Sequence, residues 1–264
     1  MLASRPAVAV VAAALSHHVG LRFDQGGAAR LERSLSRLAR QRAVTPDALA
    51  AGLAADPGAL DELIDELTVQ ETSFFRHPAQ FEALAQHILP GLAEPVTVWS
   101  AGCANGQEPY SVAMLLAELG VTEWQVVATD VSRPALERTE RGFYDQRELR
   151  GLDATRLARH GRAVEGGWEV RPELLERVTT LRHRVAHDPL PVPAGRCQVV
   201  LCRNVLIYLS PPDAQRFLDS AREALVPGGW LVLGGAEALV HHIDGMTTER
   251  AGDMFAYRKA HLSA

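Results

Sequence analysis

Residues 96–111 read Val-Thr-Val-Trp-Ser-Ala-Gly-Cys-Ala-Asn-Gly-Gln-Glu-Pro-Tyr-Ser. The β-branched and aromatic run Val96–Trp99 is typical of a buried strand. The small residues Ser100–Gly106 come next, and a helix is expected to begin near Glu108 and Pro109. Glycines let the backbone approach a ligand closely, and the N-terminus of a helix offers unpaired N–H groups. The stretch therefore predicts a nucleotide-type cofactor loop or, as the plainer alternative, an ordinary strand-to-helix turn.

After residue 96 the chain alternates between strand and helix patterns, which indicates a parallel sheet covered by helices. The expected strands are Val96–Trp99, Gln125–Thr129, Val178–Val185, Val199–Cys202 and Trp230–Leu233. The expected helices are Glu108–Leu119, Arg133–Arg141 and Pro212–Leu225. A final hairpin that closes the sheet is expected from Thr247–Arg250 and Met254–Arg258.

Asp130 directly follows the second expected strand, where doubly wound folds place the acid that binds ribose hydroxyls. Its distance from Gly106 is close to the spacing of about twenty residues that such folds use. The alternative role is a cap for the helix that begins after Ser132. Because the loop lacks Gly-x-Gly-x-x-Gly spacing, an NAD-type oxidoreductase and an S-adenosylmethionine-dependent methyltransferase both stay open. The phosphate-free S-adenosylmethionine suits Ala101–Gly106 better.

Residues 1–75 carry helix patterns and almost no strand pattern. Ala7–Leu15 predicts a short buried first helix, although an apolar run behind Arg5 also resembles a targeting segment. Thr45 is expected to cap a later helix that has Pro46 at its first position, and Asp56-Pro57 is expected to start the next one. The acidic side chains of the second of these helices are expected to face water. They are Asp61, Glu62, Asp65 and Glu66.

Ala28–Arg42 predicts a helix with two contrasting faces. Leucines recur at helical spacing on one face, and arginines recur on another. The arginines are Arg30, Arg33, Arg37 and Arg40. In an isolated helix, such a row is ordinarily interpreted as a solvated surface face.

Two stretches depart from this simple order. Thr68–Pro90 is expected to join the helices to the sheet, with Phe74 and Phe75 docking the two parts on each other. Between Gly142 and Val178 the alternation of strands and helices breaks. Gly161–Arg171 predicts a turn and a short hairpin there, and hence a small antiparallel insertion.

The composition is that of a soluble globular protein, with 47% hydrophobic and 22% charged residues in a chain of 264. The net charge of −5 argues against a dedicated nucleic-acid binder. No apolar run approaches the roughly 18 residues that span a bilayer. Cys103, Cys197 and Cys202 form no Cys-x-x-Cys pair, which fits a reducing cytosol and provides no metal framework.

Several motifs, spread over nearly the whole chain, resemble those of the CheR-type chemotaxis receptor methyltransferases. They are Leu67–Arg76 (Leu-Thr-Val-Gln-Glu-Thr-Ser-Phe-Phe-Arg), Trp99–Ser111, Ala128–Asp130, Cys202–Tyr208 (Cys-Arg-Asn-Val-Leu-Ile-Tyr) and Val226–Gly234. The resemblance implies the α/β fold of class I S-adenosylmethionine-dependent methyltransferases. A doubly wound sheet over residues 79–264 would follow an all-helical N-terminal domain over residues 1–78. A small antiparallel β-subdomain would be inserted at residues 145–178.

The implied reaction moves a methyl group from S-adenosylmethionine to glutamate side chains of methyl-accepting chemotaxis receptors, leaving S-adenosylhomocysteine. The enzyme would be a cytoplasmic monomer that neither binds nucleic acid nor inserts into the membrane. Its row of Arg30, Arg33, Arg37 and Arg40 could then dock on an acidic receptor helix. Alternatives on the same scaffold are a methyltransferase of another protein or small molecule, and a non-catalytic cofactor-binding signalling module.

The resemblance also implies site residues. Arg76 and Tyr208 would be catalytic, beside the transferred methyl group. The cofactor-binding residues would be Gln70, Thr72, Arg76, Glu108, Asp130, Asp188, Pro189, Asn204 and Val205, with no metal. Gln70 stands where the family commonly has Asn, and Asp188-Pro189 where it commonly has Asn-Leu.

Such a reaction needs no general base. A glutamate side chain has a pKa of about 4.3 and is already ionised at neutral pH. The absence of paired acids or a Ser/His/Asp set is therefore expected. Alignment of the reacting atoms alone can favour transfer by roughly 7–11 kcal/mol. Arg76 is expected to orient the incoming carboxylate by a charge-assisted contact.

Overall fold

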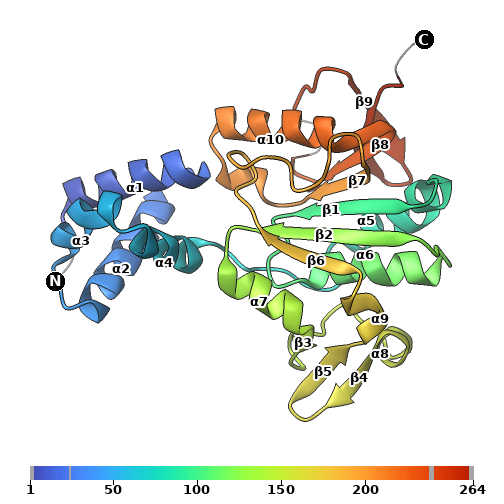
Figure 1. The fold of residues 1–264 in the computed structure, drawn as a ribbon, viewed down its shortest axis with the longest axis horizontal. Coiled ribbons are helices and arrows are strands. Elements are labelled where there is room, and N and C mark those ends of the chain that lie inside the picture. The colour runs from blue at the N-terminus through green and yellow to red at the C-terminus, as the bar shows by residue number, and fades with distance from the viewer. Residues whose placement is uncertain (1–2, 24, 238–240, 262–264) are drawn as a thin grey trace.

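The computed structural model describes residues 3–23, 25–237 and 241–261. Within these ranges the chain forms a seven-stranded sheet of order β6-β2-β1-β7-β8-β10-β9 (Figure 1). The strands are β1 (Val96–Ala101), β2 (Trp124–Asp130), β6 (Val178–Arg182), β7 (Cys197–Cys202), β8 (Leu225–Leu233), β9 (Met246–Ala251) and β10 (Met254–Lys259). The first five in the sheet order are parallel, whereas β10 runs antiparallel to both β8 and β9. The strand order reverses between β1 and β7, so the expected doubly wound sheet is confirmed.

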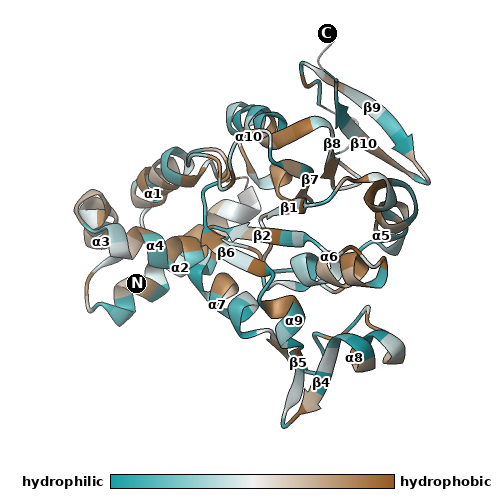
Figure 2. Cartoon of the chain, turned by 45° about the vertical axis from the view of Figure 1, so that its right-hand side comes forward, coloured by the Kyte–Doolittle hydropathy of each residue, from teal (hydrophilic) through white to brown (hydrophobic). Residues whose placement is uncertain are grey.

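Alternate side chains of the central strands enter two different cores. Val98 and Val126 pack with α6 (Gln107–Glu118) on one face of the sheet. Trp99 and Val127 pack on the other face, which α10 (Pro211–Ala224) covers. Figure 2 shows β9 as largely hydrophilic, which fits an edge strand on which Ala251 alone is buried.

The N-terminal helices form a bundle with its own core. They are α1 (Arg5–Val19), α2 (Gln25–Gln41), α3 (Pro46–Gly52), the short 3₁₀ turn η1 (Leu53–Ala55) and α4 (Pro57–Leu67). The predicted Thr45 cap is confirmed, because its side chain accepts from the N–H of Ala48. The helix start predicted at Asp56-Pro57 is also confirmed, and the Asp56 side chain caps it by accepting from the N–H of Ala59. None of the described helices is both long and apolar enough to cross a bilayer.

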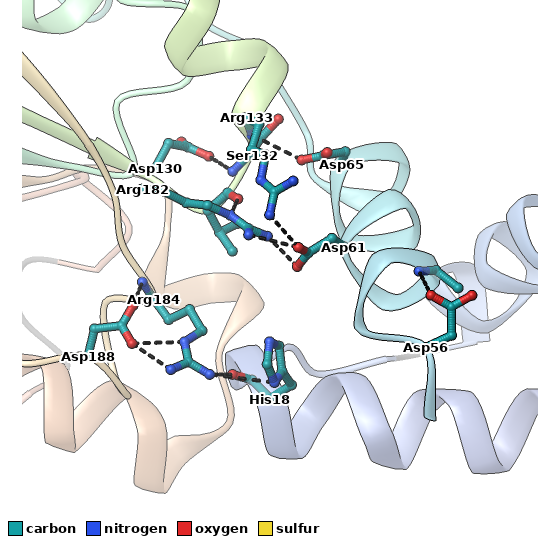
Figure 3. Close-up of polar contacts among 12 residues, drawn as sticks. His18, Asp56, Asp61, Asp65, Asp130, Ser132, Arg133, Arg182, Arg184 and Asp188 are labelled. Carbon is teal, nitrogen blue, oxygen red and sulfur yellow. Dashed lines mark hydrogen bonds and ion pairs between the residues drawn. The ribbon is translucent and has the colours of Figure 1, made fainter. Parts of the chain in front are cut away.

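The expectation that the acidic face of α4 meets water is wrong for Asp61 and Asp65. Asp61 accepts from Arg182 at 2.9 Å and from Arg133 at 2.6 Å, across the boundary between bundle and sheet (Figure 3). Asp65 accepts from the backbone N–H of Arg133 at 3.0 Å. The hydrogen bond from Arg182 holds the pKa of Asp61 below its ordinary value. Helical periodicity identifies a polar face but not the surface that it meets.

A second link between the two parts is made by the backbone. Leu21 and Leu209 form an antiparallel β-bridge between the α1–α2 connection and the start of α10. The N–H of Arg22 donates to the Tyr208 carbonyl at 2.7 Å, and the N–H of Ser210 donates to the Gly20 carbonyl at 3.0 Å. The bundle thus pairs with the segment that contains Tyr208.

The insertion is a three-stranded antiparallel sheet of order β3-β5-β4. It follows α7 (Arg133–Arg141) and comprises β3 (Phe143–Tyr144), α8 (Ala154–His160), β4 (Gly161–Val164), β5 (Gly167–Val170) and α9 (Pro172–Leu175). The predicted hairpin corresponds to β4 and β5 and is confirmed. Strand β3 was not expected, because two residues are too few to show an alternating pattern.

Phe74 and Phe75 dock the joining stretch on the sheet domain and on this insertion. The ring of Phe74 lies 4.9 Å from that of Tyr144 and 6.1 Å from that of Trp168, edge to face in both cases. Phe75 packs on Phe81 of α5 (Pro78–Ala83), which continues through the π turn η2 (Leu84–Ile88) and the 3₁₀ turn η3 (Leu89–Gly91). Both phenylalanines are buried in the sheet domain's core. The boundary at residue 78 stays a prediction.

A glycine at position 151 is required by this docking. Its φ is +99°, and a Cβ there would lie 1.9 Å from the carbonyl oxygen of Phe74. Gly120 is a matched control, because its φ is +74° but nothing lies within 4 Å of the added carbon. We expect Gly120→Ala to cost about 1–2 kcal/mol of unfolding free energy, the cost of left-handed backbone alone. Gly151→Ala should cost clearly more in urea denaturation, and equal losses in the two variants would contradict this account.

Candidate functional site

A cavity lies where the parallel strands end and the helical bundle begins. The sheet lines it with residues that follow β1, β2, β6 and β7. Of the predicted site residues, the lining contains Gln70, Arg76, Asp130, Asn204, Val205 and Tyr208. Thr72, Glu108, Asp188 and Pro189 lie outside it. In doubly wound folds, ligands bind at this edge beside the reversal of strand order.

The loop after β1 owes its shape to Gly106, which precedes α6. Gly106 has a φ of +90°, and a Cβ there would come within 2.7 Å of both the Thr139 and the Tyr144 hydroxyls. Tyr144 also donates its hydroxyl to the carbonyl of Asn105 at 2.9 Å. Packing against the insertion therefore fixes this end of the loop, while Gly102 and Ala104 face the cavity.

Asp130 ends β2 and is held by two backbone groups. Its Oδ2 accepts from the N–H of Ala104 at 2.9 Å. Its Oδ1 accepts from the N–H of Ser132 at 2.9 Å, as Figure 3 shows. Burial raises the pKa of Asp130 above its ordinary value, although both hydrogen bonds oppose the shift. The carboxylate thus braces the loop after β1 and also lines the cavity. The alternative considered from sequence, a cap for the helix after Ser132, does not describe Asp130, because Ser132 itself is the N-cap of α7. The ligand contact of Asp130 stays a prediction.

Glu108 forms a buried ion pair behind the cavity. Its Oε2 accepts from Nη1 of Arg203 at 3.0 Å, and its Oε1 accepts from the Ser100 hydroxyl at 2.8 Å. The Arg203 side chain is only 2% exposed. Arg203 Nε donates to the Gln80 amide oxygen at 2.9 Å, and Nη2 donates to the Arg76 carbonyl. Its guanidinium also lies 5.0 Å from the centroid of the Phe81 ring.

Arg203 is a site residue that the sequence did not predict, although it lies between Cys202 and Asn204 in the motif Cys202–Tyr208. A signal was available. An arginine between an apolar strand and a functional loop is expected to be buried, and buried arginines need acidic partners. The partner could not be identified from spacing, because Glu108 is 95 residues away.

Arg76 reaches the cavity but is anchored by its own segment. Nη1 donates to the Glu71 carbonyl at 2.6 Å, and Nη2 lies 3.5 Å from the Glu71 carboxylate. That carboxylate is mostly exposed, so its pairing with Arg76 is weak. The guanidinium therefore remains available to a carboxylate ligand that enters the cavity.

Two buried acceptors in the lining of the cavity indicate that its ligand is polar. Within the part of the chain that the structure describes, Oε1 of Gln70 and Oδ1 of Asn204 have no hydrogen-bond partner. Buried polar atoms are rarely left unpaired. A ligand that carries an ammonium group and hydroxyls would satisfy them together with Asp130. The amino-acid end and ribose of S-adenosylmethionine fit this donor and acceptor set.

Asp188 and Pro189 lie on the far side of the lining residues His183 and Arg184. Asp188 pairs with Arg184, which also contacts His18 of the bundle (Figure 3). The carbonyl of Pro189 lies 2.9 Å from Nε2 of His183, whose pKa is lowered by burial. These two residues support the wall of the cavity from behind.

A second hollow adjoins the cavity at Tyr208. The two share Leu21, Arg30, Val69 and Tyr208 in their linings. The second hollow is also lined by Arg22 and Arg33. The predicted arginine row is thus divided, since Arg37 pairs instead with Glu66 at 2.9 Å. Among the described residues, no cluster of three or more His, Cys, Asp or Glu side chains is placed to hold a metal ion.

A family model described as "CheR methyltransferase, SAM binding domain" matches residues 70–253. The "Chemotaxis protein methyltransferase 1" of Pseudomonas aeruginosa is 36% identical over 69% of this chain and 71% of its own length. The "Chemotaxis protein methyltransferase" of Listeria monocytogenes is 31% identical over 82% of this chain and 84% of its own.

A third relative is much longer. It is an uncharacterized 104.1 kDa protein of Rhodobacter capsulatus, 35% identical over 69% of this chain. The match covers 20% of that protein. The family match confirms the resemblance, the class I methyltransferase fold and the S-adenosylmethionine cofactor.

The buried ion pair gives a stability prediction. Replacing Arg203 by methionine leaves the Glu108 carboxylate buried without its charge partner, which typically costs about 3–5 kcal/mol. Arg141→Met is the control, because Arg141 pairs with Glu137 and both side chains are exposed, at 68% and 65%. Such surface pairs contribute about 0–1 kcal/mol. Urea unfolding of both variants measures the difference, and similar losses would contradict the central role given to Arg203.

Proposed function

Because this chain belongs to the CheR methyltransferase family, we propose that it methylates glutamate side chains of chemotaxis receptors with S-adenosylmethionine. The meeting of the two hollows at Tyr208 carries the proposal. One hollow has the acceptors that suit the cofactor, and the other has the arginines that suit an acidic protein. A reaction between two such ligands would take place at their shared boundary.

Within the cavity, Asp130 would bind the ribose, while Gln70 and Asn204 would bind the amino-acid end of the cofactor. Val205 would contact the same end. Thr72 belongs to the same joining stretch as Gln70. We propose that Glu108, Asp188 and Pro189 act through their neighbours, because Arg203, Arg184 and His183 stand between them and the cavity.

S-adenosylmethionine supplies an electrophilic methyl group, which a glutamate carboxylate oxygen would take as the bond from carbon to sulfur breaks. Arg76 would orient that carboxylate after exchanging its weak contact with Glu71 for the new one. Tyr208 would shape the methyl site or donate its hydroxyl to the same carboxylate. Neither residue has to remove a proton, since glutamate is ionised at neutral pH.

The receptor would approach along the second hollow. Arg22, Arg30 and Arg33 line it, and Nε of Arg30 is buried with no hydrogen-bond partner among the described residues. An acidic receptor segment would supply acceptors for these groups. Both hollows lie within one copy of the chain, so we propose that the enzyme acts as a monomer. We also propose that it acts in the cytoplasm.

Arg76→Ala tests the chemistry. We expect transfer of tritiated methyl groups to receptor-containing membranes to fall at least a hundredfold, because the acceptor carboxylate loses its orienting charge. Cofactor binding, measured by calorimetry, should survive at least partly. Arg141→Ala is the control, since that side chain is 68% exposed and away from the cavity.

Wild-type turnover by Arg76→Ala would overturn this assignment. The molecule and residue that carry the tritium label distinguish the three candidate functions. Base-labile label on glutamate supports the proposal, whereas label on another residue or molecule supports a different methyltransferase. Cofactor binding without any transfer supports a non-catalytic module.

Charge reversal on α2 tests the receptor surface. Arg33→Glu should raise the KM for receptor at least tenfold and flatten its dependence on salt, because a steering charge in the hollow is inverted. Arg40→Glu, on the same helix but outside the lining of the hollow, should change KM much less. Equal effects of the two variants would indicate that the arginine row is a solvated surface face and does not bind the receptor.

A further inference from the structure

Glu237 is a buried acid that the mechanism above does not use. The residue is only 2% exposed and follows β8 in the sequence Gly-Gly-Ala-Glu. Its Oε2 accepts from the backbone N–H of Asn204 at 2.9 Å and from that of Gly234 at 3.0 Å. Its Oε1 accepts from the N–H of Ile207 at 3.2 Å. One carboxylate thus joins the end of β8 to two points of the loop after β7.

That loop carries three of the residues assigned to the site, namely Asn204, Val205 and Tyr208. Asn204 has a φ of +61°, a left-handed conformation that non-glycine residues rarely adopt. Such a conformation persists only when the surroundings hold it in place. The hydrogen bond from the N–H of Asn204 to Glu237 acts on this residue directly.

The contact leaves little room for substitution. A Cβ on Gly234 would lie 2.6 Å from Oε2 of Glu237 and 3.0 Å from the N–H nitrogen of Asn204. Both oxygens of Glu237 are used as acceptors. A glutamine has a single acceptor oxygen, and its NH₂ group would face a backbone donor. The arrangement therefore requires a carboxylate at this position.

We propose that Glu237 is a positioning residue for methyl transfer, setting the loop Asn204–Tyr208 relative to the cofactor cavity. The Asn204 end of the loop serves the cofactor, and the Tyr208 end serves the transferred group. Holding both ends from one carboxylate couples cofactor binding to the geometry of transfer. The inference rests on the function proposed above. One of its two measurements, the affinity for S-adenosylhomocysteine, does not need the receptor.

The test compares Glu237→Gln with Glu94→Gln. Glu94 controls for the loss of backbone contacts, because Oε2 of this exposed residue also accepts from two backbone N–H groups, those of Thr122 at 3.1 Å and Glu123 at 2.8 Å. It lies before β1, at the opposite end of the sheet from the cavity. We expect Glu237→Gln to lower kcat at least tenfold and to raise the Kd for S-adenosylhomocysteine at least fivefold in calorimetry. Glu94→Gln should change neither value more than twofold.

A purely structural role for Glu237 gives a different result. A partly unfolded variant would bind less ligand per chain, with an unchanged Kd for the folded fraction. An unchanged Kd together with a wild-type kcat per folded chain would overturn the proposal. If Glu237→Gln does not fold, Gly234→Ala displaces the same carboxylate and should reproduce both changes. A wild-type chain that binds cofactor but forms no glutamyl ester would overturn the proposed function instead, and the Kd comparison would stand.

Discussion

The buried guanidinium of Arg203 is the constraint on which the site depends. It binds Glu108 at the start of α6, Gln80 in α5 and the backbone carbonyl of Arg76 in the joining stretch. A charge that is removed from water must be paired and hydrogen-bonded, or the fold loses several kcal/mol. Arg203 therefore fixes the positions of α5, the start of α6 and the joining stretch relative to one another. The position of the Arg76 backbone, and hence of its side chain, follows from a charge located after β7.

The order of elements was predictable because it depends on local patterns. Apolar runs identified the central strands, and Thr45 and Asp56 identified two helix starts through their own side chains. The site was only partly predictable for the same reason. Arg203 and Glu237 contact the site through groups that are distant in sequence, Glu108 for the first and the N–H groups of Asn204 and Ile207 for the second. The residues next to Arg203 and Glu237 in the sequence do not identify these partners. The contacts of Asp61 and Asp65 were missed because a polar helix face looks the same whether it meets water or arginines.

The helical bundle and the sheet domain build the cavity together. Val19, Leu21 and Arg30 line it from the bundle, and residues after the strands line it from the sheet. The ion pairs around Asp61 include the Arg133 side chain, which is 57% exposed, and pairs that open to water are weak in stability terms. Their value lies in orientation, because they fix how α4 meets the ends of β2 and β6. A ligand in the cavity would contact both parts and so strengthen their association.

The β-bridge between Leu21 and Leu209 has a consequence for modular engineering. The helical bundle donates to the Tyr208 carbonyl and accepts from the N–H of Ser210, so it supplies part of the backbone pairing of the segment that contains Tyr208. A chimera that exchanged only the helices of the bundle would leave those backbone groups without partners. A transplant that retargets this catalytic domain must therefore carry a compatible strand at residues 20–22, whatever helices surround it.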